Sequence, residues 1–230
     1  MKDNAMSAFE ELAAFQRQTE ALAQVMGRLG WDQETMMPRG ASQQRAEEMA
    51  ALEGVLHARR TDPRLDDWLA RAEALDAAGA ALLRHLRRSF ARHSLVPARL
   101  AEELARETSL AQGIWAEARA RDDVAHFLPV LERVVALKRE EAAALAQGGD
   151  PYDALLDDYE PGATSDEIAA MFARMRPRLV ALRAAVLAAP NQPAALKGEF
   201  HREGQLRLAR QLAEAFGYDF SRGRLDLAVH

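Results

Sequence analysis

Six histidines, His57, His85, His93, His126, His201 and His230, are the first residues to examine for chemistry. No two of them have the i, i+4 spacing with which a helix presents two ligands to zinc, and no His-Glu-x-x-His motif occurs. His85 and His93 are about two helical turns apart, which is only a loose match to the ligand spacing of a helical zinc site. We therefore expect surface or half-buried histidines, no metal site and no metal bound by this chain.

Adjacent acidic residues also lack the geometry of a catalytic pair. They occur at Glu47/Glu48, Asp66/Asp67, Glu102/Glu103, Asp122/Asp123, Glu140/Glu141 and Asp157/Asp158. Neighbours on a helix point about 100° apart, so such a pair is not a two-carboxylate site. Neither a phosphate-binding Gly-x-x-x-x-Gly-Lys-Ser/Thr loop nor a Gly-x-Ser-x-Gly turn is present. The residues alone predict no catalytic group, and Arg84, Arg87 and Arg88 are expected to form an exposed face.

Composition narrows the class of protein. The 230 residues are 49% hydrophobic and only 6% aromatic, with a net charge of −5, which argues weakly against a nucleic-acid partner. There is no cysteine, hence no disulfide and no thiolate site, and a reducing cytoplasm is the expected location. No apolar run reaches the roughly 18 residues of a membrane span, so we expect no membrane partner.

The elements that must position any site are helical. Apolar residues recur at helical spacing, and Ser7–Glu10 and Thr164–Glu167 are capping boxes that begin helices. We predict an all-α, elongated array of about eight helices over residues 7–29, 42–60, 62–72, 76–93, 97–121, 127–146, 164–186 and 200–216. Gly27 and Gly30 should loosen the end of the first helix, and Trp31, Met36 and Met37 should fold against the core. Pro177 should either kink the seventh helix or mark a join within it.

The last residues break this pattern. Leu225, Leu227 and Val229 alternate with polar residues, which predicts a short strand over 224–230. A single strand cannot satisfy its own backbone groups, and no second strand precedes it. Its partner lies either in another chain or in polypeptide beyond His230, and the second explanation is favoured.

Residues 150–162, DPYDALLDDYEPG, connect the two parts of the sequence. Tyr152, Leu155, Leu156 and Tyr159 give one helical turn an apolar face, which predicts an ordered connection docked on its neighbouring helices. A solvated acidic turn is the equal alternative. Structural packing is also the expected role of Trp31, and a subdivision into residues 1–149 and 150–230 is possible.

Several segments, taken together, resemble the carboxypeptidase Taq family of metallocarboxypeptidases. They are LGWDQETMMP (29–38), WAEAR (115–119) leading to FLP (127–129), the 150–162 connection, FGYD (216–219) and GRLD (223–226). The segments come in the family's order and span nearly the whole chain. The resemblance covers only the amino-terminal half of such an enzyme, whose members are about twice as long.

The resemblance implies a mostly helical, elongated fold around a deep groove, often as a homodimer, that releases carboxy-terminal amino acids from peptides with broad specificity. Its zinc or other divalent metal would sit on a His-Glu-x-x-His helix beyond the point matching His230, so the catalytic metal-binding half is absent. His230 matches the histidine of a His-Pro-Phe motif and is the one residue expected near substrate.

Two functional hypotheses follow. In the first, residues 1–230 are the amino-terminal helical portion of a metallocarboxypeptidase, supply groove wall and scaffold, and are inactive alone. In the second, the chain is a stand-alone helical interaction or scaffold module that has lost the catalytic half. Under either hypothesis exposed apolar surface should make the chain a homo-oligomer.

Overall fold

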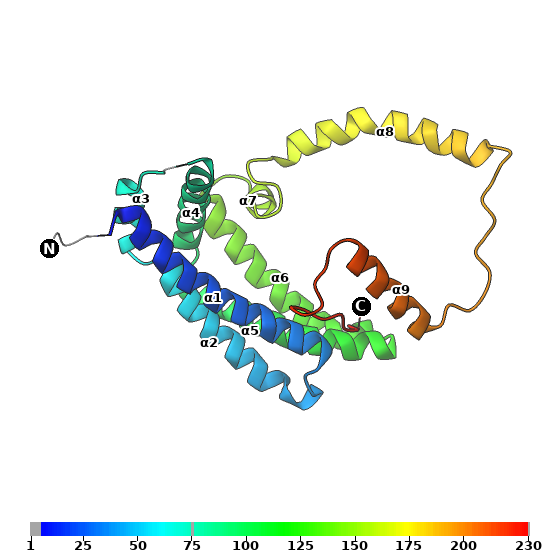
Figure 1. The fold of residues 1–230 in the computed structure, drawn as a ribbon, viewed down its shortest axis with the longest axis horizontal. Helices are drawn as coiled ribbons and strands as arrows, with labels where there is room; N and C mark the ends of the chain where they lie inside the picture. Colours follow the sequence, from blue (N-terminus) through cyan, green and yellow to red (C-terminus); the bar gives the residue numbers. More distant parts are fainter. Residues whose placement is uncertain (1–5, 75, 230) are drawn as a thin grey trace. The chain divides into compact units, whose positions relative to one another are not determined.

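The computed structural model describes residues 6–74 and 76–229, and all regular secondary structure within these ranges is helical (Figure 1). The elements are α1 (Ala8–Thr35), the 3₁₀ turn η1 (Arg39–Ala41), α2 (Ser42–Arg60), α3 (Arg64–Arg71), α4 (Ala77–Leu95), α5 (Ala98–Arg121), α6 (Val124–Ala146), α7 (Pro151–Leu156), α8 (Ser165–Ala188) and α9 (Arg202–Ala215). The all-α prediction is confirmed.

The strand predicted over residues 224–230 is wrong for the part that the structure describes. Residues 224–229 have no regular secondary structure. A strand requires ladder hydrogen bonds to a neighbouring strand, and the described residues offer none. The alternating apolar residues therefore indicate a segment with one apolar and one polar face. Without a neighbouring strand to pair with, that segment does not form a strand.

Capping residues begin the helices where the sequence placed them. The Ser7 hydroxyl accepts from the Glu10 backbone N–H at 3.3 Å, and the Glu10 carboxylate accepts from the Ser7 N–H at 2.7 Å. Thr164 and Glu167 form the same reciprocal pair at the start of α8. Each pair satisfies backbone donors that a helix start leaves without partners, so both predicted capping boxes are confirmed.

Helix α1 extends further than predicted. It continues through Gly27 and Gly30 to Thr35. Arg45 of α2 stabilises this end, because its guanidinium donates to the Leu29 carbonyl and pairs with Asp32 at 2.6 Å. The expected burial of the segment after Gly30 is wrong for two residues, since Trp31 and Met36 are 38% and 48% exposed.

Two prolines lie within helices. Pro129 is inside α6 and Pro177 is inside α8, which runs unbroken from Ser165 to Ala188. Each proline removes one backbone donor, yet the helical hydrogen bonds on both sides hold the element together.

The chain divides into two compact units. One holds the described residues up to Ala163, with Val229, and the other holds Thr164–Ala228. The connection over residues 150–162 thus belongs to the first unit. The subdivision into 1–149 and 150–230 stays a prediction.

The first unit contains the buried core. Helix α2 packs along α5, α5 packs along α6, and α1 contacts both α2 and α3 (Figure 1). One cluster joins α1, α3 and α4, and a second joins α5 to α6. The first consists of Ala8, Leu12, Phe15, Leu65, Leu69, Ala72, Leu83 and Leu86, and the second of Leu100, Leu104 and Leu137.

The second unit holds α8 and α9, and neither helix has a buried residue. The chain after α9 folds back onto it, because Arg210 stacks on the Phe220 ring with the guanidinium carbon 4.0 Å from the ring centroid. Gly217 ends α9 with a φ of 87°, the left-handed conformation that favours glycine. Local contacts, and not a core, therefore organise this unit.

Candidate functional site

The connection over residues 150–162 is ordered and docked: α7 (Pro151–Leu156) packs against α6, and the predicted Leu155 and Leu156 are half-buried. Tyr152 and Tyr159 are 68% and 84% exposed, so packing as their role is wrong. The contact with α4 is made by Asp157, whose carboxylate pairs with Arg88 at 2.5 Å and with Arg92 at 2.9 Å. Arg88 of α4, predicted to be exposed, is thus half-buried against the connection.

Three further contacts strengthen this docking. Arg92 donates to the Ala154 carbonyl at 3.0 Å and to Asp158 at 2.6 Å. The Gly162 N–H donates to the Asp157 carboxylate at 2.8 Å. That backbone hydrogen bond, followed by the Arg88 charge, lowers the pKa of Asp157 below its ordinary 3.8. Asp157 is therefore an ionised anchor that joins the connection to α4.

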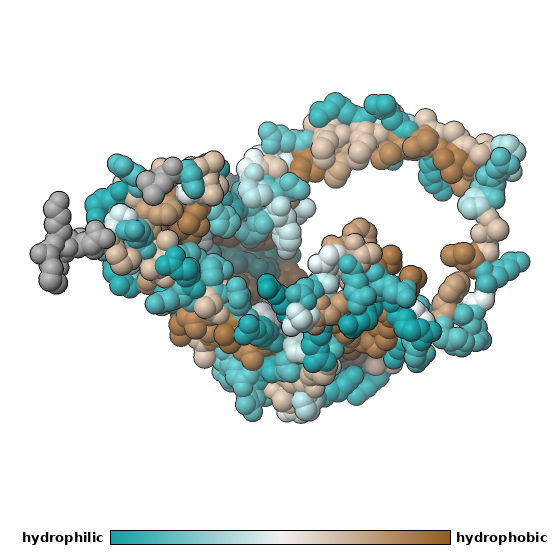
Figure 2. Space-filling view, viewed as in Figure 1, coloured by the Kyte–Doolittle hydropathy of each residue, from teal (hydrophilic) through white to brown (hydrophobic). Residues whose placement is uncertain are grey.

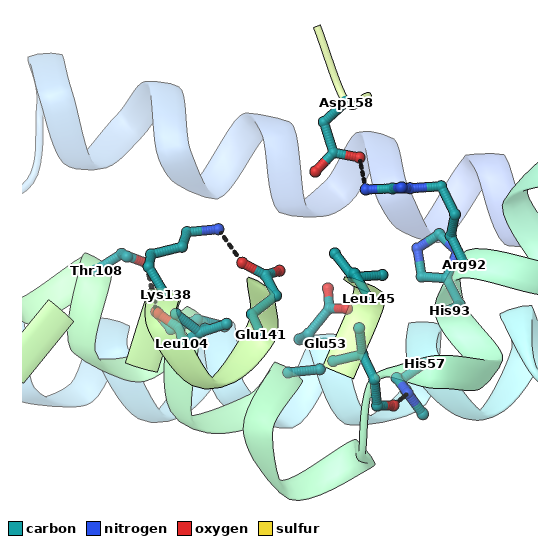
Figure 3. A pocket seen from close by; sticks show the side chains of 13 residues that line it. Glu53, His57, Arg92, His93, Leu104, Thr108, Lys138, Glu141, Leu145 and Asp158 are labelled. Atoms are coloured by element: carbon teal, nitrogen blue, oxygen red, sulfur yellow. Dashed lines mark hydrogen bonds and ion pairs between the residues drawn. The ribbon is translucent and has the colours of Figure 1, made fainter. Parts of the chain in front are cut away.

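Arg92 also lies beside a cleft of about 310 Å³ in the first unit (Figure 3). Helices α2, α4, α5 and α6 line it, and Asp158 closes one side. Its polar lining residues are Glu53, His57, Arg92, His93, Thr108, Lys138, Glu141 and Asp158. The cleft is therefore a place in the first unit where ionisable side chains from α2, α4 and α6 come together with Asp158 of the connection.

The charged groups of the cleft pair with one another. Lys138 contacts Glu141 at 2.6 Å, and Arg92 contacts Asp158 at 2.6 Å (Figure 3). Glu53 pairs at 3.3 Å with Arg60, which lies outside the lining. The Thr108 hydroxyl donates to the Leu104 carbonyl at 2.7 Å. No base lies within hydrogen-bond distance of this hydroxyl among the described residues, so the cleft holds no activated nucleophile.

Two cleft histidines have structural partners. The His57 Nε2–H donates to the Val96 carbonyl at 2.7 Å, which ties α2 to the turn between α4 and α5. His93 Nδ1–H donates to the Ser89 carbonyl at 2.7 Å, one turn earlier in α4. His93 is half-buried, as expected, whereas the expectation of a surface or half-buried side chain is wrong for His57, which is only 7% exposed.

Burial raises the pKa of one carboxyl group in this cleft and lowers the pKa of one histidine. Desolvation raises the pKa of Glu53, and the nearby positive charge of Arg60 only partly offsets it. Desolvation lowers the pKa of His93, although its hydrogen bond to Ser89 acts the other way. Both shifts favour the neutral side chain, as low dielectric surroundings do.

His93 should make folding stability depend on pH. At pH above about 6.5 the imidazole is neutral in both the folded and the unfolded chain. As pH falls below this value the unfolded chain takes up a proton that the folded chain resists, so the free energy of unfolding falls. We expect His93→Gln to lose less stability than the wild type between pH 7.5 and pH 5.5.

Urea unfolding at both pH values, followed by circular dichroism, measures this difference. His85→Gln is the matched control, because His85 lies on the same helix and is exposed. An equal loss in the wild type and His93→Gln would contradict the assignment of the pH dependence to His93.

The cleft does not fit a catalytic metal. Among the described residues, no three histidine, cysteine, aspartate or glutamate side chains come together as metal ligands do. Glu53 and His57 both line the cleft one turn apart on α2, and their i, i+4 spacing was the sequence signal that could have marked the cleft. The predicted substrate residue His230 lies outside the described residues. In the described part of the chain, no helix has the length and apolarity to cross a bilayer.

Comparison with known proteins accounts for an ordered helical scaffold whose described residues bring no set of metal ligands together. Residues 11–230 match the family described as Carboxypeptidase Taq (M32) metallopeptidase. The chain is 40% identical to thermostable carboxypeptidase 1 of Thermus thermophilus over 97% of its own length and 47% of the relative's. For thermostable carboxypeptidase 1 of Pyrococcus furiosus the identity is 28%, over 96% of this chain and 46% of the relative.

Two solved structures of related proteins also match nearly the whole chain. The crystal structure of BsuCP superposes with a TM-score of 0.88 at 25% identity, over 97% of this chain and 46% of that chain. Trypanosoma cruzi metallocarboxypeptidase 1 gives a TM-score of 0.74 at 31% identity, with the same coverage. The chain spans about half the length of the curated relatives it matches. By a family match that covers all but its first ten residues, this chain belongs to the carboxypeptidase Taq (M32) metallopeptidase family.

Proposed function

We propose that this chain acts as the amino-terminal helical part of a metal-dependent carboxypeptidase that removes carboxy-terminal residues from peptides. One observation carries the proposal: 97% of the chain matches a thermostable carboxypeptidase, of which it covers only 47%. The chain has no His-Glu-x-x-His motif, and its described residues bring no metal ligands together. We therefore propose that the chain is inactive alone.

In this proposal the chain supplies scaffold and part of the groove wall. The paired charges around the 310 Å³ cleft and the Asp157 anchor hold α4, α7 and the end of the first unit in a defined arrangement. Groups held by salt bridges and packing can position a neighbouring catalytic part without taking part in the reaction. His230 would lie near the peptide, and zinc or another divalent cation would bind outside this chain.

We also propose a class of substrate, a cellular location and an oligomeric state. The carboxypeptidase relatives make a peptide substrate the natural choice. A chain without cysteine suits the reducing cytoplasm. Exposed apolar side chains outside α8, such as Leu128 and Leu131 of α6, support homodimer formation by the enzyme or the chain.

A chimera tests the proposal. The chain is joined to the carboxy-terminal part of the Thermus thermophilus relative that it does not match, and release of the last residue from a peptide is measured with added zinc. We expect release by the chimera and none above background by the 230-residue chain, because the metal ligands come from the added part.

Two results would contradict the proposal. One is chelator-sensitive release by the 230-residue chain, which would place the metal site within it. The other is a chimera that unfolds cooperatively, and is therefore folded, but does not release the residue. The carboxy-terminal part alone serves as the control for residual activity.

A stand-alone helical scaffold is the second candidate, favoured by the absence of any buried residue in α8 and α9. The intact mass of the protein from its native source separates the two candidates. A mass near 25.4 kDa without peptidase activity favours the scaffold, and a mass of about twice that value favours the carboxypeptidase.

A further inference from the structure

Helix α8 carries an apolar stripe on one face. With 3.6 residues per turn, side chains spaced by three and four residues align along a helix. The α8 stripe is formed by Ile168, Met171, Met175, Leu179, Leu182 and Val186. Five of these six are 43–60% exposed, and Phe172 beside them is 52% exposed. Figure 2 shows apolar atoms at the surface of this helix.

Arginines edge the stripe on both sides. Arg178 and Arg174 follow one edge, whereas Arg176 and Arg183 follow the other, as their spacing along the helix dictates. The only acidic residues of α8, Asp166 and Glu167, are in its first turn. No ion pair among the described residues includes any of the four arginines. The face therefore suits an apolar surface bordered by carboxylates.

Exposure of this kind is unusual for a stable helix. A helix in a folded protein buries its apolar stripe, since amphipathic packing supplies most of its stability. The α8 stripe is longer than a turn or two and continuous from Ile168 to Val186, so scattered surface exposure does not account for it. Something must cover it.

The relatives indicate what covers it. BsuCP has the same fold over 97% of this chain, yet this region is only 46% of the BsuCP chain. The larger remainder is the polypeptide that accompanies an α8 of this fold. A protein segment carried in the same polypeptide as the helix, as in BsuCP, is a better occupant than a second copy, which would have to present the same arginine-edged face to itself.

We propose that the α8 stripe is the docking surface for the carboxy-terminal part of an M32 carboxypeptidase. This inference rests on the proposed function and adds the surface through which the two parts join. Leu179 and Leu182 at the centre of the stripe fill apolar pockets of that part, and Arg176, Arg178 and Arg183 pair with carboxylates around them.

Cysteine labelling tests the contact directly, because the natural chain contains no cysteine. Leu182→Cys and Val186→Cys place a thiol on the stripe, and Ala184→Cys places one on the opposite face of the same helix. The rate of alkylation by iodoacetamide is measured by mass spectrometry of the α8 peptide, in the 230-residue chain and in the chimera described above.

The expected result is at least tenfold slower labelling of both stripe cysteines in the chimera than in the chain, with less than threefold slowing at Ala184→Cys. Equal rates in chain and chimera at the stripe would overturn the proposal. So would equal slowing on both faces, because the stripe would then not be the specific contact.

Other occupants give distinct results, each of which also overturns the proposal. Slow stripe labelling in the chain at high but not at low concentration assigns the stripe to a second copy. Slow labelling at every concentration assigns it to another part of the same chain. Slowing only by vesicles containing phosphatidylserine assigns it to a membrane surface.

The two proposals can fail separately. A chimera that releases carboxy-terminal residues but leaves the stripe cysteines reactive keeps the proposed function and removes the docking surface. A chimera that protects the stripe but releases nothing keeps the docking surface and removes the proposed function.

Discussion

Replacing Leu100 by alanine is expected to lower the free energy of unfolding by about 2–5 kcal/mol. Leu100 is completely buried, and it packs with Leu104, Leu137 and Val96 where α5 meets α6. Truncation removes apolar contacts and leaves a cavity that long helices cannot collapse to fill. A domain is commonly stable by only about 5–15 kcal/mol, so this one change would remove a large fraction of the total.

Urea unfolding of the first unit, followed by circular dichroism, measures the loss. Leu128→Ala is the matched control, because Leu128 is on α6 and is 46% exposed. The control should change the free energy of unfolding by no more than about 0.5 kcal/mol, as most surface substitutions do. If Leu100→Ala lowered the free energy of unfolding by less than about 1 kcal/mol, the packing of α5 against α6 would contribute little to the stability of the fold.

Replacing Asp157 by asparagine should release the connection from α4. The neutral side chain loses the charge that Arg88 and Arg92 pair with, and the hydrogen bond from Gly162 becomes weaker. Hydrogen bonds to charged groups contribute about 1.5–3 kcal/mol, so local opening should increase about 10- to 100-fold. The rest of the first unit should remain folded.

Amide hydrogen exchange of peptides covering residues 150–163 measures this opening. Asp158→Asn is the control, because Asp158 makes a single ion pair with Arg92 and is more exposed. Unchanged exchange in Asp157→Asn would mean that packing of α7, and not the anchor, holds the connection.

The anchor should resist acid. Since the folded pKa of Asp157 is lowered, its stabilising contribution is fully present above the ordinary value of 3.8 and is lost only as pH falls through the lower folded value. The exchange difference between the wild type and Asp157→Asn should therefore persist in mildly acidic buffer.

Local sequence signals predicted the helices well. Reciprocal capping at Ser7 and Glu10 involves atoms three residues apart, so its geometry depends on the local chain alone. Core residues such as Leu12 and Leu100 followed from helical periodicity, because a stripe along a helix must face something. The same argument could not say which stripes this chain itself buries, and the stripe of α8 is exposed.

The candidate site was harder to predict. Glu53 and His93 are 40 residues apart, and only the packing of α2, α4, α5 and α6 brings them to one cleft. Asp157 and Arg88 were both interpreted as solvated charges, because a sequence does not show that two charged faces will meet. Alternating apolar residues near the end of the chain predicted a strand, but pairing depends on a neighbour.

By itself, the sequence determined the helical class, the helix starts and the membership of the M32 family, because these depend on local periodicity, capping and ordered motifs. Only the tertiary structure decided that Asp157 anchors the connection to α4, that ionisable groups of α2, α4 and α6 share a cleft, and that the stripe of α8 is exposed. Those features depend on which surfaces meet, and distant parts of a chain meet only through packing.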